Sequence, residues 1–253
     1  MSNSNYPLVV RARLDEPLSR WLWLVKWLLA IPHFIILIFL WIAFFFVAVI
    51  AFFAILFTGR YPRGLFDFNL GVLRWTWRVS YYTYDALGTD RYPPFTLDEV
   101  PDYPATLHLE YPEQLSRGLV LVKWWLLAIP HYVIVAIFTG NYSWGWYSKS
   151  GEWHGGGPPG LIAISVFFAA VALLFTSRYP RGLYDFILGM NRWGLRVAVY
   201  ASLMTDQYPP FRLEQGGDDP ADAQLAAQPT APAPPVPPTE PLGGMGQGPG
   251  TSP

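Results

Sequence analysis

The chain has 253 residues, of which 52% are hydrophobic and 14% are charged, and its formal net charge is -1. It contains no cysteine, which excludes disulfides, thiolate metal sites and a cysteine nucleophile. The hydrophobic residues are concentrated in blocks, and residues 27–57 carry one histidine and no formally charged side chain. That run exceeds the roughly 18 apolar residues that indicate a membrane span, so we predict an integral membrane protein.

Most motifs of the first half of the chain return in the second half. The segments LSR, VKW with LLAIPH, RYPRGL and YPPF begin at Leu18, Val25, Arg60 and Tyr92, and again at Leu115, Val122, Arg178 and Tyr208. An apolar stretch in each copy predicts a tandem membrane module with pseudo-twofold symmetry. We assign residues 1–100 and 101–213 to the copies and 214–253 to a disordered Pro/Gly/Ala-rich tail that lacks the apolar residues for a core.

Two short segments with alternating apolar residues, 9–14 and 106–110, each precede the apolar run of one copy. Alternation over this length, bounded by prolines, predicts strands. Because the two segments are equivalent parts of the repeat, we expect them to pair into a small cytoplasmic β-ribbon that ties the copies together.

We predict a helical hairpin in each copy, and therefore an all-α polytopic protein with four spans. The second copy holds extra residues rich in turn formers between 139 and 160, and irregular backbone of this kind cannot lie in lipid. The predicted spans are 21–40 and 42–58 in the first copy and 118–138 and 161–176 in the second. A single long bent helix over 31–57 is the alternative for the first copy.

Sixteen of the seventeen Lys and Arg residues lie outside the loop at 139–160. Because basic residues accumulate on the cytoplasmic side of a membrane, we predict that both hairpins enter from the cytoplasm and return to it. The expected location is the plasma membrane, with both termini cytoplasmic and a basic inner surface suited to anionic lipid headgroups.

A third helix follows in each copy, at about 62–86 and 180–203, with a proline in its first turn. At 100° per residue, the charged residues from Arg63 to Asp85 fall in a sector of about 60°, and apolar residues occupy the remainder. Such a helix would carry three arginines through the bilayer, so we predict that it is amphipathic and lies in the cytoplasmic interface. Its apolar face is wide, which leaves partial burial against the bundle as the alternative.

The arginines in and before these helices are the candidate lipid- or anion-binding residues: Arg60, Arg63, Arg74, Arg78, Arg178, Arg181, Arg192 and Arg196. In RYPRG two arginines flank a helix start, where free backbone N–H groups already attract an anion. In the alternative interpretation Arg63 pairs with Asp67 and Arg181 with Asp185, while Arg60 and Arg178 anchor the interface.

His33 and His131 each follow a proline in the first predicted span. If symmetry brings them together, a facing pair is suited to holding a haem or a metal ion, or to relaying a proton. No further histidine, cysteine or acid lies within the spans to complete a metal site. A kinked packing helix is therefore the favoured interpretation, and we expect no metal or other cofactor.

Four motifs recur in both copies: LVKW with LLAIPH, RYPRGL with a following DF pair, Arg-Trp with a second Arg at 74–78 and 192–196, and the closing TDRYPPF and TDQYPPF. Together they resemble the bacterial membrane proteins of domain-of-unknown-function family 4389. The resemblance covers residues 6–213 and implies a bacterial integral membrane protein, without an activity that can be assigned to particular residues.

No P-loop, dinucleotide fingerprint, HExxH or GxSxG motif is present, and the basic residues lie in aromatic, apolar surroundings that do not suit nucleic acid. We therefore predict a non-enzymatic scaffold or accessory subunit that contacts anionic lipids and binds a membrane-protein partner or a second copy of itself. The alternatives are a transporter or channel with an arginine-lined path, and a haem- or metal-binding membrane protein that uses the two histidines.

Overall fold

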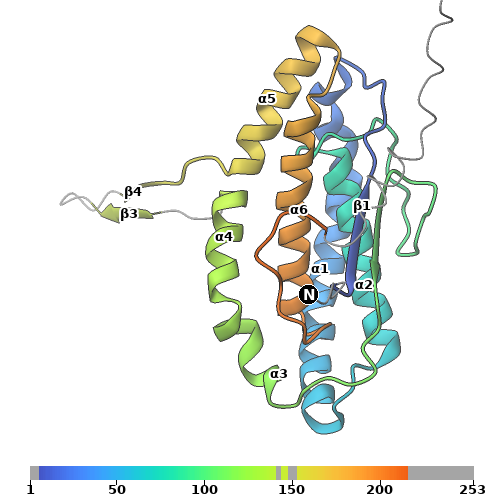
Figure 1. Cartoon of the computed structure of the whole chain (residues 1–253), viewed down its shortest axis with the longest axis vertical. Coiled ribbons are helices and arrows are strands. Elements are labelled where there is room, and N and C mark those ends of the chain that lie inside the picture. Colours follow the sequence, from blue (N-terminus) through green and yellow to red (C-terminus); the bar gives the residue numbers. More distant parts are fainter. Residues whose placement is uncertain (1–5, 141–143, 148–152, 216–253) are drawn as a thin grey trace, which may run out of the picture.

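The computed structural model describes residues 6–140, 144–147 and 153–215. These residues form a mostly helical structure with small two-stranded sheets (Figure 1). In chain order the elements are β1 (Leu8–Ala12), a 3₁₀ turn η1 (Leu22–Leu24), α1 (Lys26–Thr58), α2 (Arg63–Tyr82), β2 (Ala105–Leu109), α3 (Leu119–Val122), a π-helical segment η2 (Lys123–Leu127), α4 (Ile129–Thr139), β3 (Trp144–Tyr147), β4 (Trp153–Gly156), α5 (Leu161–Thr176) and α6 (Arg181–Ala201).

The first copy contains one apolar helix where the sequence analysis predicts a hairpin. α1 runs unbroken from Lys26 to Thr58, so the separate spans 21–40 and 42–58 are wrong and the alternative of a single long helix is the better description. The expected turn at 40–43 is Leu-Trp-Ile-Ala, which contains no residue that ends a helix. At 1.5 Å per residue, 33 residues form a rod about 50 Å long, and Gly59 ends it with a left-handed φ of 71°.

The second copy contains the same long helix with an interruption. Arg181 follows Lys123 by 58 residues, whereas Arg63 follows Lys26 by 37, so the second copy has 21 additional residues. α4 and α5 lie end to end in Figure 1, and a Cβ added to Gly140 would lie only 2.4 Å from the backbone nitrogen of Gly160. The predicted helical hairpin in this copy is also wrong, because the loop at 139–160 interrupts one helix and contains the β3–β4 hairpin.

α2 and α6 begin after a proline, as the sequence predicts, but they lie inside the protein. α1 packs on α2, while α4 and α5 pack on α6. Tyr81 of α2 meets Tyr184 of α6 through their hydroxyl groups at 2.7 Å, and Trp77 and Tyr81 are almost completely buried. The two helices are thus a middle layer, in agreement with the alternative of burial against the bundle.

The predicted ribbon is present. β1 pairs antiparallel with β2, in a register that sets Val10 opposite Leu107. One face of each strand is buried, and the opposite face directs Arg11 and His108 outward. β1 packs on α6 of the second copy and β2 packs on α2 of the first, so the strands tie the copies together.

The two copies run in opposite directions. In Figure 1, α1 and α6 run one way along the long axis, while α2, α4 and α5 run the other way. The second copy begins where α1 ends, because the Leu115 N–H donates to the Gly59 carbonyl at 2.8 Å. The pseudo-twofold axis is therefore perpendicular to the helices and passes through the ribbon.

Candidate functional site

The layer formed by α1 and by α4 with α5 is apolar and largely uncovered. The buried residues of α1 form one narrow seam, and seventeen large apolar side chains of this helix are exposed, Phe57 to 72%. α5 exposes Phe175 to 77%. α1 is long and apolar enough to cross a membrane, and the pair Leu119–Leu127 with Ile129–Thr139, bent by 41°, would count as a second such helix. Apolar surface of this extent marks a contact with lipid or with another apolar surface.

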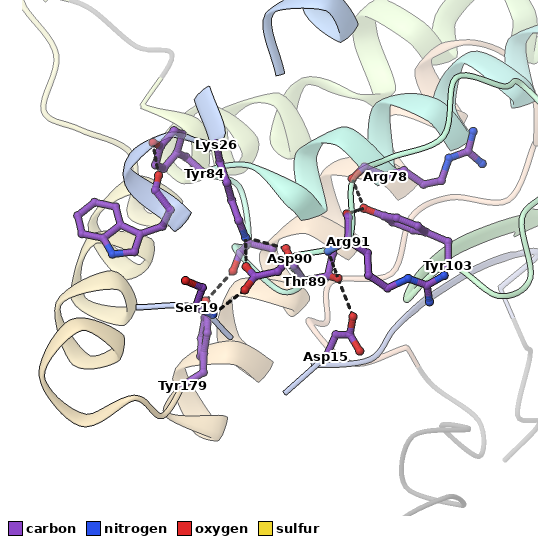
Figure 2. Close-up of polar contacts among 12 residues, drawn as sticks. Asp15, Ser19, Lys26, Arg78, Tyr84, Thr89, Asp90, Arg91, Tyr103 and Tyr179 are labelled. Carbon is purple, nitrogen blue, oxygen red and sulfur yellow. Dashed lines mark hydrogen bonds and ion pairs between the residues drawn. The ribbon is translucent and has the colours of Figure 1, made fainter. Parts of the chain in front are cut away.

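A buried lysine begins the apolar helix of the first copy, and Figure 2 shows it meeting an aspartate. Lys26 is 1% exposed, and its Nζ lies 2.9 Å from Asp90 Oδ1 and donates to the Thr89 carbonyl at 2.7 Å. The second oxygen of Asp90 accepts the Ser19 N–H. One carboxylate therefore joins the start of α1 to the loop that follows α2.

We call this arrangement of a buried lysine, an aspartate, a threonine carbonyl and a serine N–H a clamp, and the second copy repeats it residue for residue. Lys123 Nζ lies 2.7 Å from Asp206 Oδ1 and donates to the Thr205 carbonyl at 3.0 Å, while Asp206 also accepts the Ser116 N–H. Neither lysine and neither aspartate is among the site residues predicted from the sequence. Their signal was the recurrence of LSR, VKW and TD at matching places in both copies.

Each buried histidine joins an apolar helix to the middle layer. His33 Nδ1 accepts the Trp75 indole N–H at 3.0 Å, and its ring stacks on Phe95 with centroids 4.0 Å apart. Because Nδ1 is the acceptor, the neutral ring carries its proton on Nε2.

His131 makes the equivalent contacts in the second copy, with the Trp193 N–H at 3.1 Å and the Phe211 ring at 4.4 Å. His33 lies near the start of α1 and His131 near the start of α4, and these starts are at opposite ends of the molecule in Figure 1, so the two histidines do not form a facing pair. Among the described residues no group of three or more His, Asp or Glu is placed to hold a metal ion.

Four of the eight candidate arginines hold backbone carbonyls. Arg78 donates to the carbonyls of Asp98 and Thr96, and Arg196 donates to those of Arg212 and Glu214. Arg74 donates to the Leu107 carbonyl of β2 and Arg192 to the Val10 carbonyl of β1. The arginines of the middle layer thus fix the ribbon and the loops that follow α2 and α6.

Burial lowers the pKa of Arg78 and Arg196 to about 10, and nearby arginines contribute to the shift. Both guanidinium groups therefore remain protonated at neutral pH and keep their charge-assisted hydrogen bonds.

The other four candidates are exposed and lie at opposite ends of the molecule. Arg60 and Arg63 stand between α1 and α2 at one end of Figure 1, while Arg178 and Arg181 stand between α5 and α6 at the other. The Arg63 guanidinium lies 4.0 Å from the centroid of the Tyr111 ring. The two RYPRG segments therefore lie at opposite ends of the molecule, because the two copies are inverted.

Charged side chains surround the ribbon at the middle of the helices. Arg74 forms an ion pair of 3.0 Å with Glu99, whose side chain is 40% exposed, and the His108 side chain is 62% exposed beside it. Arg11 is exposed on the neighbouring strand. One side of the molecule is therefore charged at the mid-length of the helices, where the other side is apolar.

The family model described as "Domain of unknown function (DUF4389)" matches residues 20–96 and 160–212, two segments that correspond to the two copies. The second segment starts where α5 begins, directly after the interrupting loop. No curated protein and no solved structure matched the chain.

Proposed function

Because the chain belongs to the DUF4389 family, whose description names no activity, we propose a function from its geometry: a non-enzymatic membrane scaffold that lies within one leaflet. In this arrangement α1 and α4 with α5 lie in the hydrocarbon, parallel to the membrane plane. α2 and α6 lie above them at headgroup depth, and the ribbon faces water.

The observation that carries the proposal is the position of the charges around the ribbon. Arg74 is near the middle of α2, and it holds both β2 and Glu99. If the helices crossed the bilayer, Glu99, Arg11 and His108 would lie near its centre. An ionised side chain there costs about 2.5–3.5 kcal/mol, and α2 is about 30 Å long, the thickness of the hydrocarbon core. In the in-plane arrangement the same groups lie in water.

Two further properties support this orientation. The apolar part of α1 is about 46 Å long, well beyond the roughly 30 Å of hydrocarbon that a span needs. The inverted copies also put Arg60 and Arg178 at opposite ends, so basic residues give a crossing orientation no preferred side. With the twofold axis along the membrane normal, both arginines reach the headgroups of the same leaflet.

A transporter is the second candidate, because inverted repeats are a common architecture of transporters. That function requires α1 to cross the membrane. It also requires an ion path, yet the arginines of the middle layer already donate to backbone carbonyls. We therefore rank the transporter below the scaffold.

Sidedness of labelling tests the proposal. The natural chain has no cysteine, so Arg60→Cys, Arg178→Cys and Arg11→Cys each introduce a single reactive thiol. In sealed membrane vesicles, we expect a membrane-impermeant maleimide to label all three from the same side. Labelling of Arg60→Cys and Arg178→Cys from opposite sides would instead establish a crossing protein and support the transporter. If the protein is a scaffold, we also expect a cross-linker attached at Arg11→Cys, on the water-facing ribbon, to capture a partner protein.

A further inference from the structure

We infer that the junction between the two copies holds a phosphate-binding pocket formed by Arg60 and Arg117. The ligand has two possible sources. One is a lipid headgroup, and for this source the inference rests on the proposed membrane function. The other source is free phosphate. Their shared chemistry is a phosphate group with at least one negative charge.

The pocket lies at the end of α1. It has a volume of about 410 Å³ and is lined by Thr58, Gly59, Arg60, Gln114, Leu115 and Arg117. Two of these residues come from the turn after α1, and three come from the start of the second copy, which the Leu115–Gly59 hydrogen bond holds in place. The volume falls within the roughly 300–1,000 Å³ of small-molecule sites.

The charge of the pocket is uncompensated. No acidic residue lines it, and among the described residues no ion pair involves Arg60 or Arg117. Two guanidinium groups and the amide N–H groups of Gln114 provide several hydrogen-bond donors, and the lining contains no carboxylate. Arginine in such a setting favours phosphate, because its planar fork of N–H groups matches two phosphate oxygens.

The simplest alternative is that the arginines cap the carbonyls at the end of α1. Other donors already fill that role. The Gly59 N–H donates to the Ile55 carbonyl, the Thr58 hydroxyl donates to the Ala54 carbonyl, and the Leu115 N–H donates to the Gly59 carbonyl. The hydrogen bonds of the described residues include none from either guanidinium to these carbonyls. Both side chains are exposed at the surface and free to receive a ligand.

Gly59 lines this pocket at the turn that ends α1. Its φ of 71° is left-handed, and a Cβ there would lie 3.5 Å from Arg117 Nε. The equivalent residue of the second copy is Ser177, and Pro17 replaces Gln114, so the other end of the molecule lacks the carboxamide donor. Arg20 and Arg178 are the counterparts of Arg117 and Arg60, which gives a matched control of equal charge.

The test is calorimetric titration of the detergent-solubilised full chain with two probes: inorganic phosphate and dihexanoyl phosphatidylglycerol. We expect one saturable site for at least one probe, and Arg60→Ala/Arg117→Ala should weaken it about tenfold or more. Arg20→Ala/Arg178→Ala should change the dissociation constant less than about twofold. Tighter binding of the lipid probe identifies a headgroup as the ligand, and tighter binding of inorganic phosphate identifies free phosphate.

Two outcomes overturn the inference: no saturable binding of either probe, or equal weakening by the two double variants, which indicates general charge. Arg60→Lys/Arg117→Lys guards against misfolding, since it keeps the charge but loses the fork and should bind with intermediate affinity. Sidedness of labelling is independent of this titration. Absence of saturable binding therefore does not contradict the in-plane orientation, and labelling from opposite sides does not contradict the phosphate pocket.

Discussion

Removing the buried lysine of one clamp tests whether these pairs hold the apolar layer to the rest of the molecule. Lys26→Met keeps the length of the side chain but leaves Asp90 without its cation. Breaking a fully buried pair costs about 3–5 kcal/mol. The Asp90 side chain is 26% exposed and retains the Ser19 N–H, so we expect a smaller loss, about 2–3 kcal/mol of unfolding free energy.

The assay is reversible denaturation in detergent, followed by tryptophan fluorescence. Lys123→Met is the matched variant, because the Asp206 side chain is 25% exposed and lies 2.7 Å from Lys123 Nζ. The unfolding free energy of Lys123→Met should therefore fall by a similar amount. In Lys26→Met/Asp90→Asn no unpaired charge remains, and we expect the double variant to be at least about 1 kcal/mol more stable than the sum of the single losses implies. A loss below about 0.5 kcal/mol in Lys26→Met, or strict additivity, would refute the clamp.

Three further predictions concern packing and the interrupted helix. Gly71→Val should lower the unfolding free energy by about 1–3 kcal/mol, because a Cβ on Gly71 would lie 2.7 Å from Leu97 Cβ; the same denaturation experiment measures it, and an unchanged stability would contradict the close contact. Deleting residues 141–161 should join α4 to α5 and yield a folded protein with the helical circular dichroism of the parent, whereas an unfolded product would show that the loop is required. His33→Leu leaves the Trp75 indole N–H without an acceptor and should cost about 1–3 kcal/mol without altering the visible spectrum; a visible absorption band in the parent that disappears in the variant would instead support a haem ligand.

The sequence predicts those parts of the fold that depend on local patterns. Alternation at 9–14 and 106–110 is enough to place the ribbon, since β1 and β2 overlap these segments. The prolines before Arg63 and Arg181 place the starts of α2 and α6 for the same reason.

The helical hairpins are wrong because hydropathy reports how apolar a segment is but not where it turns. The run from Lys26 to Thr58 has the composition of two spans or of one long rod, and only the absence of a turn former at 40–43 favours the rod. The opposite direction of the copies was also beyond the sequence, because a repeat has the same residues whether its copies are parallel or inverted.

The candidate site was only partly predictable. From the sequence, an arginine stripe on α2 is equally consistent with an anion site and with donors to backbone carbonyls. The carbonyls that Arg74 and Arg78 contact belong to β2 and to the loop before it, and the sequence does not show that these segments lie beside α2. The pocket of Arg60 combines residues from both copies, and Arg117 enters it only because the second copy begins beside Gly59. The recurrence of Lys26 with Asp90 was available in the sequence and points to the clamps.

The depth of α1 in the membrane tests the central claim most directly. Spin labels attached at Leu28→Cys, Ile42→Cys and Phe57→Cys, all exposed positions along α1, report their immersion through accessibility to oxygen and to a water-soluble nickel complex. The in-plane arrangement predicts nearly equal depth for all three labels, within one leaflet. A label at Ile42 near the bilayer centre, with those at Leu28 and Phe57 near opposite surfaces, would contradict the account.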